Sequence, residues 1–134
     1  MVYLTRKEHF NAAHRLHVAQ WSSEKNLEVF GKCSNKNWHG HNYELLVTVK
    51  GAPDKDTGFI INARDLSEVI KKNVLDKLDH KNLSVDVDFM QGIQPSTENL
   101  AKAIWNELLP HLKEKLYCIK IVETENIYAE YYGE

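Results

Sequence analysis

Residues 39–50 read HGHNYELLVTVK, and this stretch decides both the central strand and the place of the chemistry. Successive side chains of a β-strand point to opposite faces, so the imidazoles of His39 and His41 share one face. Upstream, His14 in the stretch FNAAHRL offers a third imidazole. Three histidines with one open coordination position are typical of catalytic zinc. We therefore predict a metal site at His14, His39 and His41.

The composition is that of one domain over residues 1–134, with 43% hydrophobic residues to fill a core. A net charge of −2 with interspersed lysines and acids argues against a nucleic-acid partner. No apolar run approaches the ~20 residues of a membrane span, and the N-terminal stretch lacks a signal-peptide core. With two cysteines, Cys33 and Cys118, expected as reduced thiols, we expect a cytoplasmic protein.

The hydrophobic pattern predicts an α+β domain with the element order β-β-α-α-β-β. One helix begins at an N-cap Asn62, and the second opens at Ser96 or Thr97. Residues 17–38 are expected to form a long polar loop. The predicted strands cover residues 2–11, 44–50, 116–124 and 127–132. We expect a four-stranded antiparallel sheet with both helices packed on one face.

Cys33 lies six positions before His39, and two interpretations of it remain open. It could be a small buried residue or a fourth zinc ligand, and as a ligand it would close the site and make the metal structural. Alternatively, the thiol lies beside the metal and acts as a base or a nucleophile, with a pKa lowered by nearby positive charge. Spacing alone does not separate these alternatives.

Further polar residues have both a structural and a chemical interpretation. Asp79 and His80 follow the first helix, where a histidine favours the helix dipole but could also exchange protons. Glu123 lies in an apolar strand and is either an outward-facing acid or a carboxylate that binds an amidine-like edge, such as that of guanine or a pterin. The remaining histidines are interpreted as exposed or hydrogen-bonded: His9, His17 and His111.

Taken in order, several motifs resemble the 6-pyruvoyl-tetrahydropterin synthase family across nearly the whole chain. Each motif is weak alone, and the ordered set is specific. They are Phe10-x-Ala12-x-His14, Phe30-Gly31-Lys32-Cys33, His39-Gly40-His41-Asn42-Tyr43, Leu78-Asp79-His80-Lys81-Asn82-Leu83, Ser96-Thr97-Glu98-Asn99, Glu123-Thr124 and Tyr132-Gly133-Glu134.

The resemblance implies a tunnelling fold, assembled as a homohexamer (a dimer of trimers) with active sites between subunits. It implies one Zn²⁺ per subunit on the three histidines and a catalytic cysteine at Cys33. The family's Asp-His pair, usually supplied by a neighbouring subunit, falls on Asp79 and His80. Its pterin-anchoring glutamate falls on Glu123, and Thr97 and Glu98 resemble a stretch that lines the pterin pocket.

The implied reaction converts 7,8-dihydroneopterin triphosphate to 6-pyruvoyl-tetrahydropterin with elimination of triphosphate. Zinc acidifies the C–H bonds next to the substrate hydroxyls, and the cysteine moves protons with the Asp-His pair. Mg²⁺ could accompany the triphosphate. Candidate basic groups for the phosphates are Arg15, Lys32 and Lys36.

Two alternatives accompany this expectation. Family relatives make 6-carboxy-5,6,7,8-tetrahydropterin for queuosine synthesis and release acetaldehyde, but typically have three residues between the cysteine and His-x-His, against five here. The second alternative is a non-catalytic module, in which Cys33 and the three histidines form a closed zinc site that stabilises the fold. The family commonly has glycine at the position of Trp38, so we expect the loop after Cys33 to differ in shape.

Overall fold

Two long strands form the centre of the sheet in the computed structural model, which describes residues 1–134. Strands β1 (Val2–His14) and β2 (His39–Gly51) pair antiparallel over their full length, so that His14 lies opposite His39. β4 (Leu116–Thr124) pairs with β2, and β5 (Ile127–Tyr131) forms that edge. The short β3 (Lys81–Asn82) runs parallel to β1, giving the order β3-β1-β2-β4-β5.

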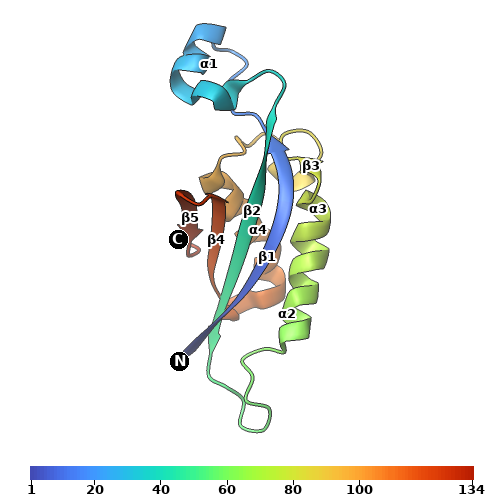
Figure 1. Ribbon diagram of the computed structural model, residues 1–134. Coiled ribbons are helices and arrows are strands. Elements are labelled where there is room, and N and C mark those ends of the chain that lie inside the picture. The colour runs from blue at the N-terminus through green and yellow to red at the C-terminus, as the bar shows by residue number, and fades with distance from the viewer.

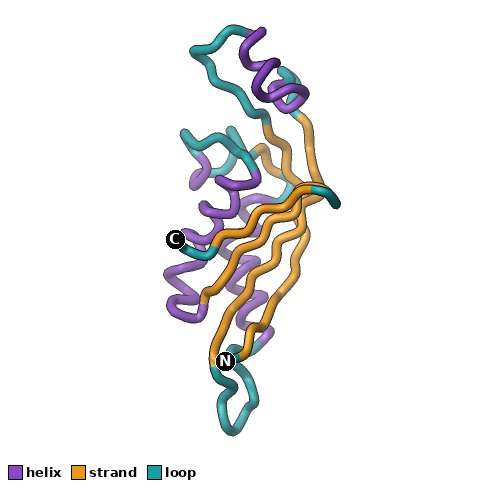
Figure 2. The backbone as a smooth tube through the Cα atoms, turned by 90° about the vertical axis from the view of Figure 1, so that its left-hand side faces the viewer, coloured by secondary structure: helices purple, strands orange, loops and turns teal.

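The helices cover one face of this sheet (Figures 1 and 2). Helix α2 (Ala63–Ile70) continues through a π-helical turn at 71–75 into α3 (Asp76–Leu78), and α4 (Thr97–Leu112) lies beside it. Side-chain oxygens cap both helices as predicted, because Asn62 accepts from the Arg64 amide and Ser96 from the Asn99 amide. Single 3₁₀ turns occupy residues 31–34, 88–90 and 113–115.

The core lies between the helices and the inward face of the strands. Alternate residues of β2 point into it, and Tyr43, Leu45, Val47 and Val49 are at most 1% exposed. The β1 side chains on the same face are Phe10, Ala12 and finally His14. The apolar packing therefore continues up to the point where the histidines begin. None of the helices is both long and apolar enough to span a lipid bilayer.

The predicted order and layer arrangement agree with the structure, with three differences. The sheet has a fifth strand, β3, which at two residues is too short to produce a hydrophobic period. The central strands are longer than predicted and extend to the histidines at their ends. Residues 17–38 contain a helix, α1 (Ser23–Phe30), which stands apart at the top of Figure 1 and is capped by Ser22.

Candidate metal centre and active site

The three histidines predicted as metal ligands lie together at one end of the helix-covered face of the sheet. Their candidate ligand atoms lie within 4.8 Å of one another, and no other side chain belongs to this cluster. The register explains the grouping, because His14 is paired with His39 and Ala12 with His41. The Nε2 atoms of His14 and His39 are 3.0 Å apart. Three imidazoles thus converge on a single point.

Hydrogen bonding leaves these imidazoles ready to bind a metal ion. His14 Nδ1 donates to the Pro95 carbonyl at 2.8 Å, which directs the Nε2 lone pair into the cluster. The buried atoms His39 Nδ1 and His41 Nε2 have no hydrogen-bond partner. Burial lowers the pKa of all three imidazoles, and neighbouring histidines lower it further. Neutral, converging imidazoles form the donor set of a three-histidine metal site, so a metal ion fits here.

Glu123 is the acid closest to the histidine cluster. Its Oε1 lies 3.5 Å from His14 Nε2 and 3.4 Å from His41 Nε2. The β2–β4 register accounts for this position, because the preceding residue, Val122, pairs with Glu44. The Tyr43 hydroxyl lies 3.4 Å from His14 Nδ1. Its pKa is raised mainly by burial, and the negative charge of Glu123 raises it further. The carboxylate therefore lies beside the histidines rather than on the outer face.

A cavity of about 420 Å³ opens next to the cluster. The backbone N–H of Leu16 donates to the Cys33 carbonyl at 2.8 Å and holds the 3₁₀ turn of Cys33 against the end of β1. The β4–β5 hairpin and the start of α4 supply the other walls. Five residues predicted from sequence line this one cavity: His14, Cys33, Thr97, Glu98 and Glu123.

Cys33 lies outside the group of side chains that are close enough to share a metal ion. Burial raises the pKa of its thiol, and the nearby charge of Glu123 raises it further. One of the two sequence interpretations of Cys33 requires nearby positive charge to lower this pKa. The histidines around it are neutral, however, and the charge that acts on the thiol is the Glu123 carboxylate. In the chain without a metal, the thiol is therefore protonated at neutral pH.

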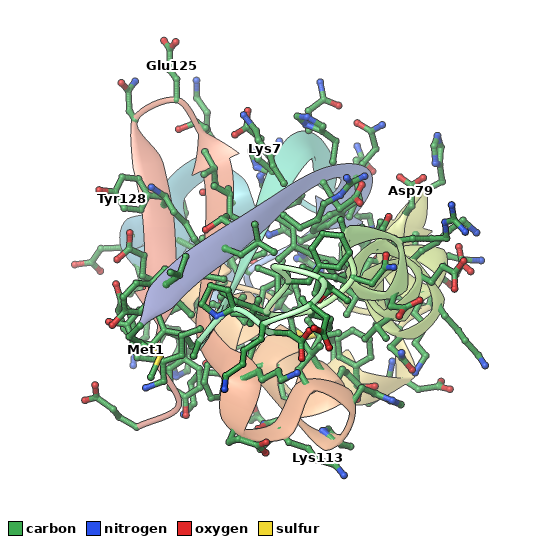
Figure 3. All side chains as sticks on the ribbon, turned by 90° about the horizontal axis from the view of Figure 1, so that it is seen from below. Met1, Lys7, Asp79, Lys113, Glu125 and Tyr128 are labelled. Carbon is green, nitrogen blue, oxygen red and sulfur yellow. The ribbon has the colours of Figure 1, made fainter.

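Asp79 and His80 lie away from this cavity, at the edge formed by β3 and β1. The Asn11 amide donates to Asp79 Oδ1 at 2.8 Å, and the His80 amide donates to the Asn11 carbonyl at 2.6 Å. Asp79 Oδ2 is 3.1 Å from His80 Nδ1, and the hydrogen bond from Asn11 is the main cause that lowers the pKa of Asp79. In Figure 3, Asp79 and Tyr128, which lines the Cys33 cavity, lie on opposite sides.

His17 and Trp38 show two further features near the histidines. His17 as a residue is only partly buried, but its Nδ1 is buried and has no hydrogen-bond partner in the chain. Trp38 adopts a φ of 64°, in the left-handed region that favours glycine. Glycine at this position in relatives was the available signal, because only glycine adopts this backbone without strain.

Comparisons with known proteins agree with this geometry. A family model described as 6-pyruvoyl tetrahydropterin synthase matches residues 3–134. The 6-pyruvoyl tetrahydrobiopterin synthase of Dictyostelium discoideum is 50% identical over 133 residues, covering 99% of this chain and 97% of the relative. The 6-carboxy-5,6,7,8-tetrahydropterin synthase of Bacillus subtilis is 32% identical over 136 residues, covering 96% and 83%.

Among solved structures, the 6-pyruvoyl tetrahydropterin synthase of Caenorhabditis elegans superposes with a TM-score of 0.93 at 36% identity, covering 99% of this chain and 96% of that one. Its similarity extends over the strands and helices that carry the histidine cluster and the Cys33 cavity. Sequence motifs, fold and whole-chain similarity all lead to one conclusion: this chain belongs to the 6-pyruvoyl tetrahydropterin synthase family.

Proposed function

We propose that this protein converts 7,8-dihydroneopterin triphosphate to 6-pyruvoyl-tetrahydropterin with elimination of triphosphate. The observation that carries the proposal is the convergence of three neutral imidazoles beside a cavity that also holds a thiol and a carboxylate. Relatives named for the pyruvoyl product share up to half of their residues with this chain. Residues 1–134 would act as a single domain.

In this proposal, His14, His39 and His41 hold one zinc ion per chain. Zinc supplies a Lewis acid that makes the C–H bonds next to the substrate hydroxyls more acidic. Glu123 and Thr97 bind the pterin ring, since a carboxylate can accept two hydrogen bonds from its amidine-like edge. Glu98 lines the same cavity.

Cys33 would be the base that removes and returns protons at the side chain of the substrate. Its raised pKa keeps the thiol protonated until positive charge is added nearby, so its activation depends on the occupied metal site. The fourth-ligand alternative is disfavoured, because Cys33 lies outside the histidine cluster.

Asp79 and His80 would reach the Cys33 of another subunit. Within one chain they lie at the opposite edge of the sheet, which supports a site shared between copies (Figure 3). A homohexamer built as a dimer of trimers would bring the two edges together, and it would also cover the exposed sheet edges. Mg²⁺ would accompany the triphosphate of the substrate. Free thiols at Cys33 and Cys118 are compatible with a cytoplasmic location.

Product analysis by mass spectrometry tests this function. Zinc-loaded protein is incubated with 7,8-dihydroneopterin triphosphate, and we expect the mass of 6-pyruvoyl-tetrahydropterin together with free triphosphate. The mass of 6-carboxy-tetrahydropterin with acetaldehyde would assign the protein to the second family activity, that of the Bacillus subtilis relative. No turnover by zinc-loaded protein would contradict both, and Cys33→Ala serves as the inactive control.

A further inference from the structure

A second cavity, of about 320 Å³, is lined by residues that adjoin the candidate ligands but by none of the three histidines, and it plays no part in the chemistry above. Arg15 directly follows the ligand candidate His14, and Trp38 directly precedes His39. The Pro95 carbonyl that accepts from His14 belongs to the same cavity wall. Three residues that line this cavity therefore adjoin His14 or His39, two of them in sequence and Pro95 through a hydrogen bond. We call it the Arg15 pocket.

Two buried polar atoms belonging to residues of the Arg15 pocket have no partner in the chain: His17 Nδ1 and Ser84 Oγ. Gln94 fixes the backbone of His17 through two hydrogen bonds. The His17 amide donates to Gln94 Oε1 at 3.3 Å, and Gln94 Nε2 donates to the His17 carbonyl at 2.5 Å. Buried polar groups are normally hydrogen-bonded, so a polar ligand in this pocket can pair with both atoms.

The charge of the Arg15 pocket determines the kind of ligand it would take. Arg15 brings a guanidinium whose Nε donates to the Ser34 carbonyl at 3.0 Å, which orients the group and leaves its terminal nitrogens available. None of the residues that line the pocket is acidic, whereas Glu98 and Glu123 line the Cys33 cavity. Arginine, serine hydroxyl and imidazole can all donate hydrogen bonds. Such a set matches an oxyanion.

Trp38 adds an independent indication that the Arg15 pocket is used. A bulky residue in the left-handed region is strained, and such strain is found chiefly at functional sites. The strained backbone places the Trp38 side chain in the wall of the pocket, where it helps to enclose a ligand. The exposed Lys32 and Lys36 do not line this pocket.

We propose that the Arg15 pocket binds phosphate groups, and that in the reaction it holds the phosphate tail of the substrate. The identity of the tail rests on the proposed function, whereas oxyanion binding does not. The substrate's triphosphate is attached to the same short side chain as its hydroxyls. A phosphate pocket lined by Pro95, the hydrogen-bond partner of His14, is therefore suitably placed to receive the triphosphate. Arg15 and Ser84 donate to the phosphate oxygens.

Paired ligands test this proposal in metal-loaded protein carrying Cys33→Ala, so that the substrate is not consumed. Isothermal titration compares 7,8-dihydroneopterin with its triphosphate. We expect Arg15→Gln to weaken triphosphate binding about tenfold or more, because a charge-assisted hydrogen bond is lost. Ser84→Ala should weaken it in the same direction. Both variants should bind unphosphorylated dihydroneopterin as the parent protein does, which also verifies their folding.

Arg64→Gln is the matched control, since Arg64 is an exposed arginine in the first turn of α2. Equal triphosphate affinity in Arg15→Gln, Ser84→Ala and Arg64→Gln would overturn the proposal. Inorganic phosphate serves as a second probe that needs no pterin. Saturable phosphate binding that is lost in Arg15→Gln supports the pocket. If neither pterin binds, that failure counts against the proposed function and leaves the phosphate result standing. Binding that Arg15→Gln leaves unchanged overturns the pocket.

Discussion

Cys33 and Glu123 influence each other across the same cavity. Because the negative charge of Glu123 disfavours a nearby thiolate, it raises the pKa of Cys33 beyond the effect of burial. Glu123→Gln removes that charge, so the pKa of Cys33 should fall and the thiolate should form at lower pH. The rate of iodoacetamide alkylation against pH, measured in metal-free Cys118→Ala protein, reports this shift. An unchanged profile would show that the carboxylate does not act on the thiol.

Trp38 allows a direct test of backbone strain. Its φ of 64° costs energy for any residue with a Cβ, and glycine avoids that cost. Trp38→Gly and Trp38→Ala both remove the indole, so the difference between them isolates the backbone. We expect the glycine variant to be more stable by about 1 kcal/mol in urea unfolding. Equal stability of Trp38→Ala and Trp38→Gly would show that the backbone at this position is not strained.

At the residue scale, strand periodicity predicts that His39 and His41 share one face, and the upstream stretch offers His14 as the third candidate ligand. The structure brings these three imidazoles together. Strand periodicity could not show that Glu123 approaches the histidines, because that depends on the register between β2 and β4. The raised pKa of Cys33 follows from the same three-dimensional neighbourhood. No sequence pattern predicts that His17 Nδ1 lacks a hydrogen-bond partner.

Among the elements, α1 depends on one buried side chain. Asn26 is 3% exposed, and its amide donates to the carbonyls of Val18 and Ser22 while its oxygen accepts from the Val18 amide. Asn26→Ala leaves the Val18 amide unpaired, which costs about 1–3 kcal/mol, whereas the Val18 and Ser22 carbonyls still accept from the Trp21 and Asn26 amides. Hydrogen exchange at the Val18 amide should accelerate, and the melting temperature should fall. The exposed Asn37→Ala is the control, and equal exchange in both variants would contradict this role.

The elements that could be predicted are those with long hydrophobic periods. The helix from Asn62 and the hairpin of β4 and β5 follow from apolar spacing and capping residues. Helix α1 was missed because its residues are mostly exposed and polar, although Ser22 gave a capping signal. β3 exists only because the chain after α3 passes β1, a tertiary contact that two residues cannot encode.

At the scale of the whole molecule, the separation of His80 from the Cys33 cavity predicts complementation between subunits. Cys33→Ala and His80→Ala proteins should each be inactive, while co-refolded mixtures should regain activity. With random mixing at equal amounts, about one quarter of the sites receive both intact residues if two subunits share each site. Activity assays across mixing ratios check this. Mixtures that stay inactive would show that both residues act within one chain.

The central claim is that three histidines hold the metal and leave Cys33 free for chemistry. Metal content per chain, measured by atomic emission after zinc loading and desalting, tests it most directly in wild-type, His39→Ala and Cys33→Ala proteins. We predict one zinc per chain in the wild type and in Cys33→Ala, and little zinc in His39→Ala. Loss of zinc from Cys33→Ala would make the cysteine a ligand and contradict the account.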